Sequence, residues 1–144
     1  MGHDGMESYF ADTTYIVATV NIQDREHARA ERLSRRLAEG ELGNFRLVMT
    51  DYIFDEVVTA ILTRTRRHDL AARTGRSLNE SGAWRLVHLT AADFEASWTM
   101  FLDREDKLWS FTDCTSFSLM ERLGLRTAIA FDENFTQAGF ALLA

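Results

Sequence analysis

The sequence contains no proline, a single cysteine and a single lysine among its 144 residues. One cysteine excludes an internal disulfide, and without a second cysteine or clustered histidines the chain lacks a zinc-like ligand set. We therefore expect Cys114 to be a small buried hydrophobic side chain. Because proline is absent, the ends of helices and strands must be inferred from glycine, asparagine and charge.

Long hydrophobic runs are also absent. No uninterrupted apolar run approaches the roughly 20 residues that span a bilayer, and no N-terminal segment has the basic-then-apolar layout of a signal peptide. We therefore expect a cytoplasmic protein without a membrane partner. Residues 1–5, MGHDG, fit no structural element. We interpret them as a disordered tail or a remnant of cloning.

Positive charge is not in excess either. The formal net charge of -6 argues against a protein-wide basic surface of the kind that binds nucleic acid by electrostatics alone. A local patch is still compatible with the sequence, because fifteen of the sixteen basic residues are arginine, the better bidentate ligand of phosphate. Such arginines form short groups, although a solvated helix face is the more common reason for them. The groups include Arg35 with Arg36, and Arg64 with Arg66 and Arg67.

Short apolar segments alternate with helical patterns along the whole chain. With 46% hydrophobic residues, we expect a single domain over residues 1–144 with one core. The alternation predicts an α/β fold around a mostly parallel sheet of four to five strands. Strands are predicted at 6–11, 45–50, 84–89 and 126–131, with a fifth at 139–144. Helices are predicted at 13–20, 24–40, 52–65, 68–80, 91–105 and 113–122.

Local patterns support these helices. Helix 24–40 is amphipathic, with Ala28, Leu33 and Leu37 near one stripe. Hydroxyl and acidic residues stand where N-caps belong. The candidate caps are Thr50 or Asp51, Thr90 and Thr112.

Three acidic residues lie at one predicted edge of the sheet. Asp12 directly follows the first strand and Asp132 the fourth, while Asp113 begins the helix that leads into the fourth strand. In open parallel sheets, ligands bind outside the carboxyl ends of the strands. Any one of these acids is more often a helix cap than a catalytic group, so their convergence is the significant feature.

A fourth acid comes from helix 52–65, which follows the second strand. The helical wheel does not separate Asp55 from Glu56, because both lie about equally far from the apolar stripe. Neighbours three and four positions away favour Glu56 slightly.

Grouped carboxylates predict a metal site. Two like charges about 4 Å apart repel by roughly 4 kcal/mol at an effective dielectric constant near 20, so such a group takes up protons or binds a cation. Oxygen ligands select Mg²⁺ (or Mn²⁺), an ion suited to phosphodiester hydrolysis. Hydroxyls nearby are expected to hold the carboxylates in place. These are Thr13, Ser110, Thr112 and Thr115.

At these acids the sequence resembles the PIN-domain nucleases, and most closely the VapC toxins of type II toxin–antitoxin pairs. The resemblance extends from about Tyr9 to Phe140. ADTTYIVA is similar to the opening motif and TDYIFDEVVTAIL to the second, where the resemblance selects Glu56. WSFTDCTSF matches the third motif and AFDENFTQAGF the fourth. The four family acids are thereby assigned to Asp12, Glu56, Asp113 and Asp132.

The resemblance implies a three-layer α/β/α domain that acts as a Mg²⁺- or Mn²⁺-dependent endoribonuclease on structured RNA, a tRNA or an rRNA. It also implies a homodimer that is silenced by a cognate antitoxin protein. One departure is that Glu133 and Asn134 stand where relatives often carry basic or histidine residues. Candidate RNA-binding cations are Arg64, Arg66, Arg67 and Lys107.

Other functions remain open at this stage. An aspartyl phosphotransferase of the haloacid-dehalogenase type fits badly, because Thr14 stands where a second aspartate is needed. A receiver domain needs a lysine after a late strand, and the only lysine is Lys107. A PIN nuclease of RNA maturation outside toxin–antitoxin systems, and a catalytically silent binding module, are the two alternatives that keep the same fold.

Overall fold

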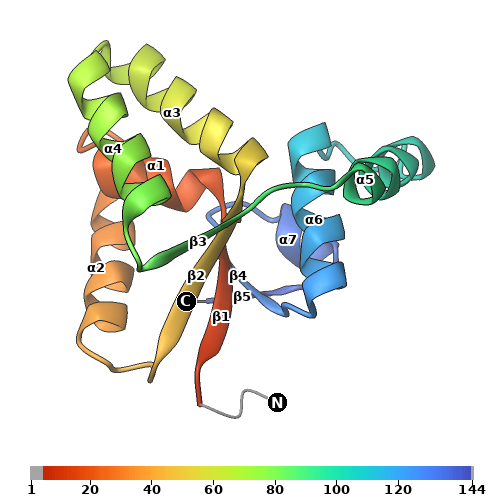
Figure 1. Ribbon diagram of the computed structural model, residues 1–144, viewed down its shortest axis with the longest axis horizontal. Helices are drawn as coiled ribbons and strands as arrows, with labels where there is room; N and C mark the ends of the chain where they lie inside the picture. Colours follow the sequence, from red (N-terminus) through yellow and green to blue (C-terminus); the bar gives the residue numbers. More distant parts are fainter. Residues whose placement is uncertain (1–4, 144) are drawn as a thin grey trace.

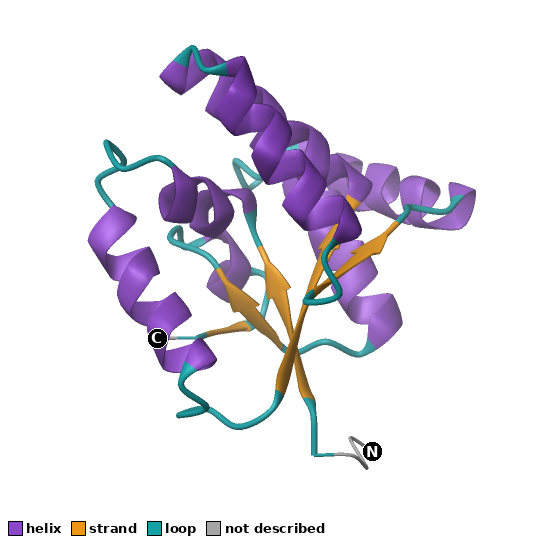
Figure 2. Ribbon diagram, turned by 60° about the vertical axis from the view of Figure 1, so that its left-hand side comes forward, coloured by secondary structure: helices purple, strands orange, loops and turns teal. Residues whose placement is uncertain are grey.

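The computed structural model describes residues 5–143 and contains a five-stranded parallel sheet with helices on both faces (Figures 1 and 2). The predicted α/β class and three-layer arrangement are therefore confirmed. Four of the five residues of the predicted N-terminal tail, and Ala144, lie outside the described residues. None of the described helices combines the length and apolar character needed to cross a bilayer.

The strand order is β3-β2-β1-β4-β5, and every neighbouring pair is parallel. β1 and β4 are therefore neighbours although more than a hundred residues separate them. This pairing brings together the carboxyl ends of the two strands that precede Asp12 and Asp132. The strands are β1 (Glu7–Ala11), β2 (Phe45–Thr50), β3 (Trp84–Val87), β4 (Thr127–Ile129) and β5 (Ala141–Leu142).

The helices divide into two layers according to the direction in which the chain crosses the sheet. From β1 to β3 the chain moves one way, and its helices lie on one face; from β3 to β5 it moves back, and its helices lie on the other (Figure 1). Because parallel crossovers share one hand, reversing the direction moves the helices to the opposite face. The first layer has α1 (Thr13–Val20), α2 (His27–Ala38), α3 (Asp51–Thr65) and α4 (His68–Glu80), and the second has α5 (Ala91–Asp103), α6 (Phe111–Leu123) and α7 (Asn134–Gln137).

Two predicted helix starts were wrong. α2 begins at His27, because Asp24 accepts the amides of Glu26 and His27 in a turn before the helix. The exposed Ala28 is also off the buried stripe, where Ala30 stands instead.

α6 begins at Phe111, because Ser110 is the N-cap in place of Thr112. The Ser110 hydroxyl accepts the amide of Asp113, while the Asp113 carboxylate accepts the amide of Ser110. In this capping box the carboxylate fixes the start of the helix that carries it. The short helix α7 was not predicted.

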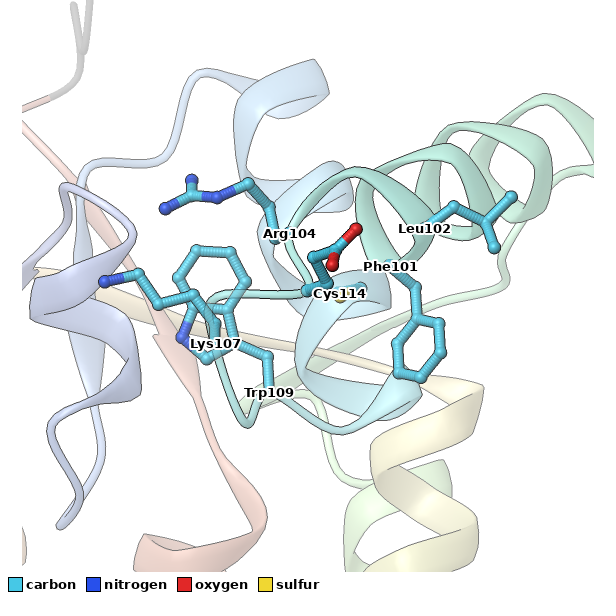
Figure 3. A pocket seen from close by; sticks show the side chains of 7 residues that line it. Phe101, Leu102, Arg104, Lys107, Trp109 and Cys114 are labelled. Carbon is cyan, nitrogen blue, oxygen red and sulfur yellow. The ribbon is translucent and has the colours of Figure 1, made fainter.

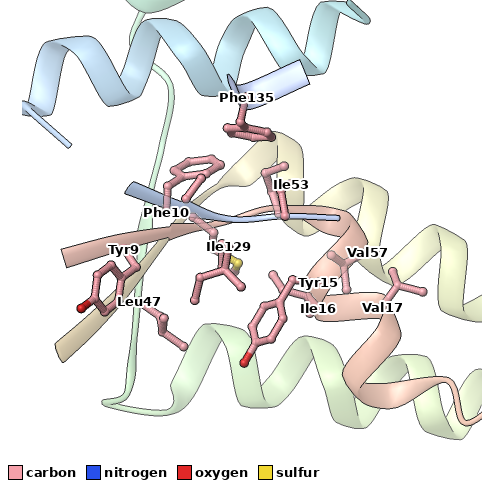
Figure 4. Close-up of a cluster of buried hydrophobic side chains, with 14 of the residues drawn as sticks. Tyr9, Phe10, Tyr15, Ile16, Val17, Leu47, Ile53, Val57, Ile129 and Phe135 are labelled. Atoms are coloured by element: carbon pink, nitrogen blue, oxygen red, sulfur yellow. The ribbon is translucent and has the colours of Figure 1, made fainter. Parts of the chain in front are cut away.

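The core lies between the sheet and both helical layers, and Figure 4 shows its centre. Ile53, Val57 and Ile61 are fully buried at intervals of four residues, so one stripe of α3 packs inward. Burial of each such side chain contributes about 1.5–3 kcal/mol. Cys114 is fully buried, as the sequence predicts. This packing fixes the rotation of α3, and therefore the direction of its acidic residues.

A charged pair joins the two helices of the second layer. The guanidinium of Arg122 on α6 donates to both carboxylate oxygens of Asp93 on α5, at 2.6 and 2.9 Å. The side chain of Asp93 is only 3% exposed, and it also accepts the amide of Thr90. The bond to Arg122 lowers the pKa of Asp93. This pair helps to hold α6, and thus Asp113, against the rest of the layer.

We expect Arg122→Met to lower the midpoint of thermal unfolding at neutral pH by roughly 5 °C, because Asp93 is left buried without its partner. Since the folded pKa of Asp93 lies below its ordinary value, the stabilisation is present above about pH 4 and is lost as pH falls. The difference between variant and wild type should therefore shrink toward pH 3. Arg126→Met, which removes an exposed arginine nearby, is the control. Equal midpoints at pH 7 would contradict the role of the pair.

Candidate active site

Asp12 stands at the point where the strand order of the sheet reverses. Its amide donates to the carbonyl of Ile129 on β4, so the residue is fixed between the ends of β1 and β4. It is also the N-cap of α1, and its carboxylate accepts the amide of Thr14 at 3.2 Å. The residue is 5% exposed. A carboxylate is thus held, almost buried, where open α/β sheets bind ligands.

Thr14 links this carboxylate to the loop that follows β4. Its hydroxyl donates to Asp12 Oδ2 at 2.7 Å and accepts the amide of Phe131 at 3.0 Å. One side chain therefore fixes both Asp12 and the segment that carries Asp132. Sequence reasoning selected Thr13 for this kind of role and missed Thr14, although both belong to the same Asp-Thr-Thr motif.

Asn134 connects the third and fourth predicted acids. Its side-chain amide donates to Asp113 Oδ2 at 3.0 Å, and its backbone amide donates to Asp132 Oδ1 at the same distance. The residue that departs from the family pattern therefore orients two of the four carboxylates. Only the meeting of α6 with the β4–α7 loop reveals this role.

Glu56 and Asp55 now have different environments. The hydroxyl of Thr13 donates to Glu56 Oε1 at 2.7 Å, and Glu56 is half-buried, whereas Asp55 is exposed. This contact joins α1 to α3 at the site. Glu56 is thus oriented like the other three acids, while Asp55 lies at the rim.

An open cavity of about 440 Å³ brings the predicted acids together. The cavity is bounded by the start of α1, one side of α3, the start of α6 and the loop after β4. Its wall contains five carboxylates and one cation, Arg64. The lining residues are Asp12, Thr13, Thr14, Asp55, Glu56, Thr59, Ala60, Thr63, Arg64, Ser110, Asp113 and Asp132.

Two carboxyl groups of this cavity, those of Asp12 and Asp113, have raised pKa values. Burial raises the pKa of Asp12 to about 7, and the charges of Asp132 and Asp113 add to the effect against the two hydrogen bonds from Thr14. Burial and the charge of Asp132 also raise the pKa of Asp113, although the bonds from Ser110 and Asn134 oppose this. The site therefore favours a bound proton or a bound cation.

Several predicted residues lie elsewhere. Thr112 does not line the cavity, and the buried Thr115 hydroxyl donates to the carbonyl of Thr112 and not to a carboxylate. Arg66 and Arg67 form the corner between α3 and α4, where Arg67 is paired with Asp69 at 2.6 Å.

Lys107 lines a different cavity, of about 300 Å³, between the end of α5 and the start of α6. Figure 3 shows it beside Arg104 and Trp109. The guanidinium carbon of Arg104 lies 4.9 Å from the ring centroid of Trp109. The RNA contacts predicted for Lys107, Arg66 and Arg67 stay predictions.

Comparison with known proteins identifies the family. The PIN-domain profile matches residues 9–141, nearly the whole chain. The chain belongs to the PIN-domain family. It is 33% identical over 132 residues to the 23S rRNA-specific endonuclease VapC20 of Mycobacterium tuberculosis, covering 91% of this chain and 94% of that protein.

Two solved structures share this fold. The crystal structure of M. tuberculosis VapC20, described as a sarcin–ricin loop cleaving toxin, superimposes with a TM-score of 0.83 at 28% identity, over 92% of this chain and 96% of that chain. VapBC-1 of nontypeable Haemophilus influenzae gives a TM-score of 0.63 at 18% identity, over 94% and 96% of the two chains. That second likeness shows the shared fold.

The donor set of this PIN domain fits a hard divalent cation. The converging ligands are carboxylate oxygens, and a cation beside them would stabilise the charged form of Asp12, whose pKa burial raises to about 7. Within residues 5–143, no three histidine, cysteine or acidic side chains already form a group that could hold an ion. Mg²⁺ usually keeps several waters and takes only one or two protein carboxylates, so the fit does not require a closed cage.

We expect Asp12→Asn to stabilise the PIN domain in chelator-treated buffer at pH 8 by on the order of 2–4 kcal/mol. Between the ordinary aspartate pKa near 4 and the folded pKa of about 7, the unfolded state releases a proton that the folded state keeps. The free energy of unfolding of the wild type should therefore fall as pH rises through this interval, and the slope should be smaller in the variant, where only the raised pKa of Asp113 remains.

Denaturant unfolding from pH 5 to pH 8 measures this slope. Asp55→Asn is the matched control, because Asp55 is an exposed carboxylate of the same cavity. Identical slopes in the wild type and Asp12→Asn would show that Asp12 titrates like an exposed acid.

Proposed function

We propose that this PIN domain is a Mg²⁺- or Mn²⁺-dependent endoribonuclease that hydrolyses phosphodiester bonds in structured RNA and acts as the toxin of a toxin–antitoxin pair. The observation that carries the proposal is the convergence of Asp12, Glu56, Asp113 and Asp132 in one cavity. Support comes from the 33% identity to a 23S rRNA-specific endonuclease over 91% of the chain. An rRNA is therefore the substrate class to test first, before tRNA.

The acidic residues of the cavity are the expected metal ligands. Asp12, Asp113 and Asp132, together with Glu56, would hold one or two ions, directly or through the waters that the ion keeps. When bound, Mg²⁺ or Mn²⁺ would activate a water for attack on phosphorus and neutralise the charge that develops on the phosphate. Each carboxylate has a fixed orientation before substrate arrives, because each accepts at least one hydrogen bond from the chain. Such preorganisation avoids the cost of reorienting the ligands during reaction.

Arg64, which lines the cavity, would contact the substrate. It lies on α3, two turns after Glu56, and is exposed. An arginine can hold two oxygens of one phosphate, which would position the scissile bond relative to the acids.

We expect Mn²⁺ to raise the thermal unfolding midpoint of the wild type in chelator-treated buffer, and Asp113→Asn to lose most of that shift. At a hundredfold excess over the dissociation constant, binding stabilises by about 2.7 kcal/mol. The same variant should cleave an RNA hairpin with the sarcin–ricin loop sequence of 23S rRNA at a rate about a hundredfold or more below the wild type, if the wild type cleaves it.

Glu133→Gln is the matched control for this experiment. Glu133 is an exposed acid beside Asp132 that does not line the cavity, so its loss should leave both the Mn²⁺ shift and the rate unchanged. If Mn²⁺ at millimolar concentration shifts neither the wild type nor Glu133→Gln, the metal-dependent nuclease is the wrong function.

The partners of the proposed toxin are a cognate antitoxin protein and a second copy of the chain, and its place of action is the cytoplasm, where rRNA is found. The antitoxin follows from the likeness to VapC20, which is described as a toxin. A surface suited to the second copy lies on α5, where Phe94, Trp98, Phe101 and Leu102 are each 41–55% exposed. Trp98 stacks on Phe101 with ring centroids 5.8 Å apart. Exposed apolar groups of this size typically mark interaction sites.

We expect the wild type to be a dimer by light scattering at micromolar concentration, and Trp98→Lys to be a monomer, because the new charge would be buried against the second copy. Ile22→Lys is the control, since Ile22 is 72% exposed in the turn between α1 and α2. A monomeric wild type would refute the dimer and leave the nuclease proposal intact.

A further inference from the structure

Arginines line one flank of α2. Arg29, Arg32 and Arg36 lie within about 60° of each other on the helix, at 100° per residue. Arg25 stands in the turn just before the helix. We call Arg25, Arg29, Arg32 and Arg36 the α2 arginine stripe. The helical part of the stripe is about 10 Å long, and it lies away from the buried stripe of Ala30, Leu33 and Leu37.

The stripe is concentrated positive charge in a protein of net charge -6. Within the described residues, neither Arg25 nor Arg32 has a carboxylate at ion-pair distance. Arg29 has only Glu26, at 3.6 Å, and its side chain remains 48% exposed. Arg36 is paired with Glu41 at 3.2 Å. Arg25 and Arg32 are thus available to an anion, and the half-exposed Arg29 is available in part.

One contact ties this stripe to the active site. The guanidinium carbon of Arg29 lies 4.6 Å from the ring centroid of Phe131, in a cation–π contact. Phe131 precedes Asp132, and its amide donates to the Thr14 hydroxyl that holds Asp12. The N-terminal end of α2 therefore abuts the rim of the acidic cavity, while the rest of the stripe leads away from it.

The cavity itself needs such a surface. A phosphate backbone that approaches five carboxylates and one arginine meets mostly like charge, and a bound cation would offset this at one point only. RNA affinity must then come from cations outside the cavity. Arg64 supplies one on α3, and the α2 arginine stripe supplies several that begin beside the loop that follows β4.

We propose that the α2 arginine stripe is the surface that binds the RNA backbone next to the scissile phosphate, so that the substrate crosses the cavity from α2 toward Arg64. This inference rests on the proposed nuclease function and adds to it a docking path. Arginine suits the role because its fork holds phosphate oxygens in pairs.

The test compares two triple variants that lose equal charge. Arg25→Gln/Arg29→Gln/Arg32→Gln removes the stripe apart from the paired Arg36. Arg46→Gln/Arg76→Gln/Arg85→Gln removes three exposed arginines elsewhere, none of them on α2. Binding of the labelled sarcin–ricin hairpin is measured by anisotropy in chelator, from roughly 50 to 200 mM salt.

We expect the stripe variant to bind about tenfold or more weakly, with the slope of log affinity against log salt reduced by about 2, and the control variant to stay within about twofold of the wild type. A single Arg32→Lys variant, which keeps the charge, should retain the wild-type slope. Unchanged unfolding midpoints in all variants would confirm that the fold is intact. If the triple variant is unstable, Arg32→Gln alone repeats the test, because Arg32 is exposed and has no ion-pair partner among residues 5–143.

Three outcomes overturn the proposal. If the stripe variant has the affinity and the salt slope of the wild type, and the wild type cleaves RNA, the docking path is refuted and the nuclease function is not. Equal losses in both triple variants would show an effect of net charge. Retained RNA affinity with lost binding to a co-expressed antitoxin would assign the stripe to an acidic protein partner. A wild type that neither binds RNA nor responds to Mn²⁺ would instead refute the nuclease function on which the path depends.

Discussion

The near-complete burial of the Asp12 carboxylate between the ends of β1 and β4 is the constraint on which the site depends. A buried charge is costly unless it is hydrogen-bonded or paired. Here two bonds from Thr14 offset part of that cost, while burial and the charges of Asp132 and Asp113 still raise the pKa of Asp12 to about 7. The same threonine accepts the Phe131 amide, so the bonds that support Asp12 also fix the loop of Asp132. The hydrogen bonds of Thr14 therefore both stabilise this junction and arrange the acids around it.

Around this junction, each neighbouring acid is held by a group from another part of the fold. Glu56 on α3 accepts the hydroxyl of Thr13 on α1, and Asp113 on α6 accepts the side-chain amide of Asn134 on α7. The helices that supply these groups come from both faces of the sheet, because the crossovers that follow β1 and β4 run in opposite directions. The topology that brings opposite layers together thus also concentrates negative charge, and the contact of Arg29 with Phe131 brings the start of α2 to the border of this acidic site.

Much of this arrangement could be predicted, and the failures have identifiable causes. The strand-helix alternation and the acids at the strand ends follow from local periodicity and from the rule that carboxyl ends of parallel strands share one edge. The start of α6 was misplaced by two residues, because Thr112 and Ser110 are both good caps and only the reciprocal bonds of Ser110 and Asp113 distinguish them. The helical wheel did not separate Glu56 from Asp55, and the resemblance to PIN-domain nucleases selected Glu56, which the structure shows bonded to Thr13.

By itself, the sequence determined the fold class, the order of the elements and the identity of the acids at the sheet edge, since these depend on residues close together in the chain. Only the tertiary structure decided which groups orient those acids. Thr14 and Phe131 are 117 residues apart, and Asn134 and Asp113 are 21 apart. The contact of Arg29 with Phe131 likewise spans most of the chain. Such contacts depend on strand order and on the rotation of packed helices, and these are fixed only when the core closes.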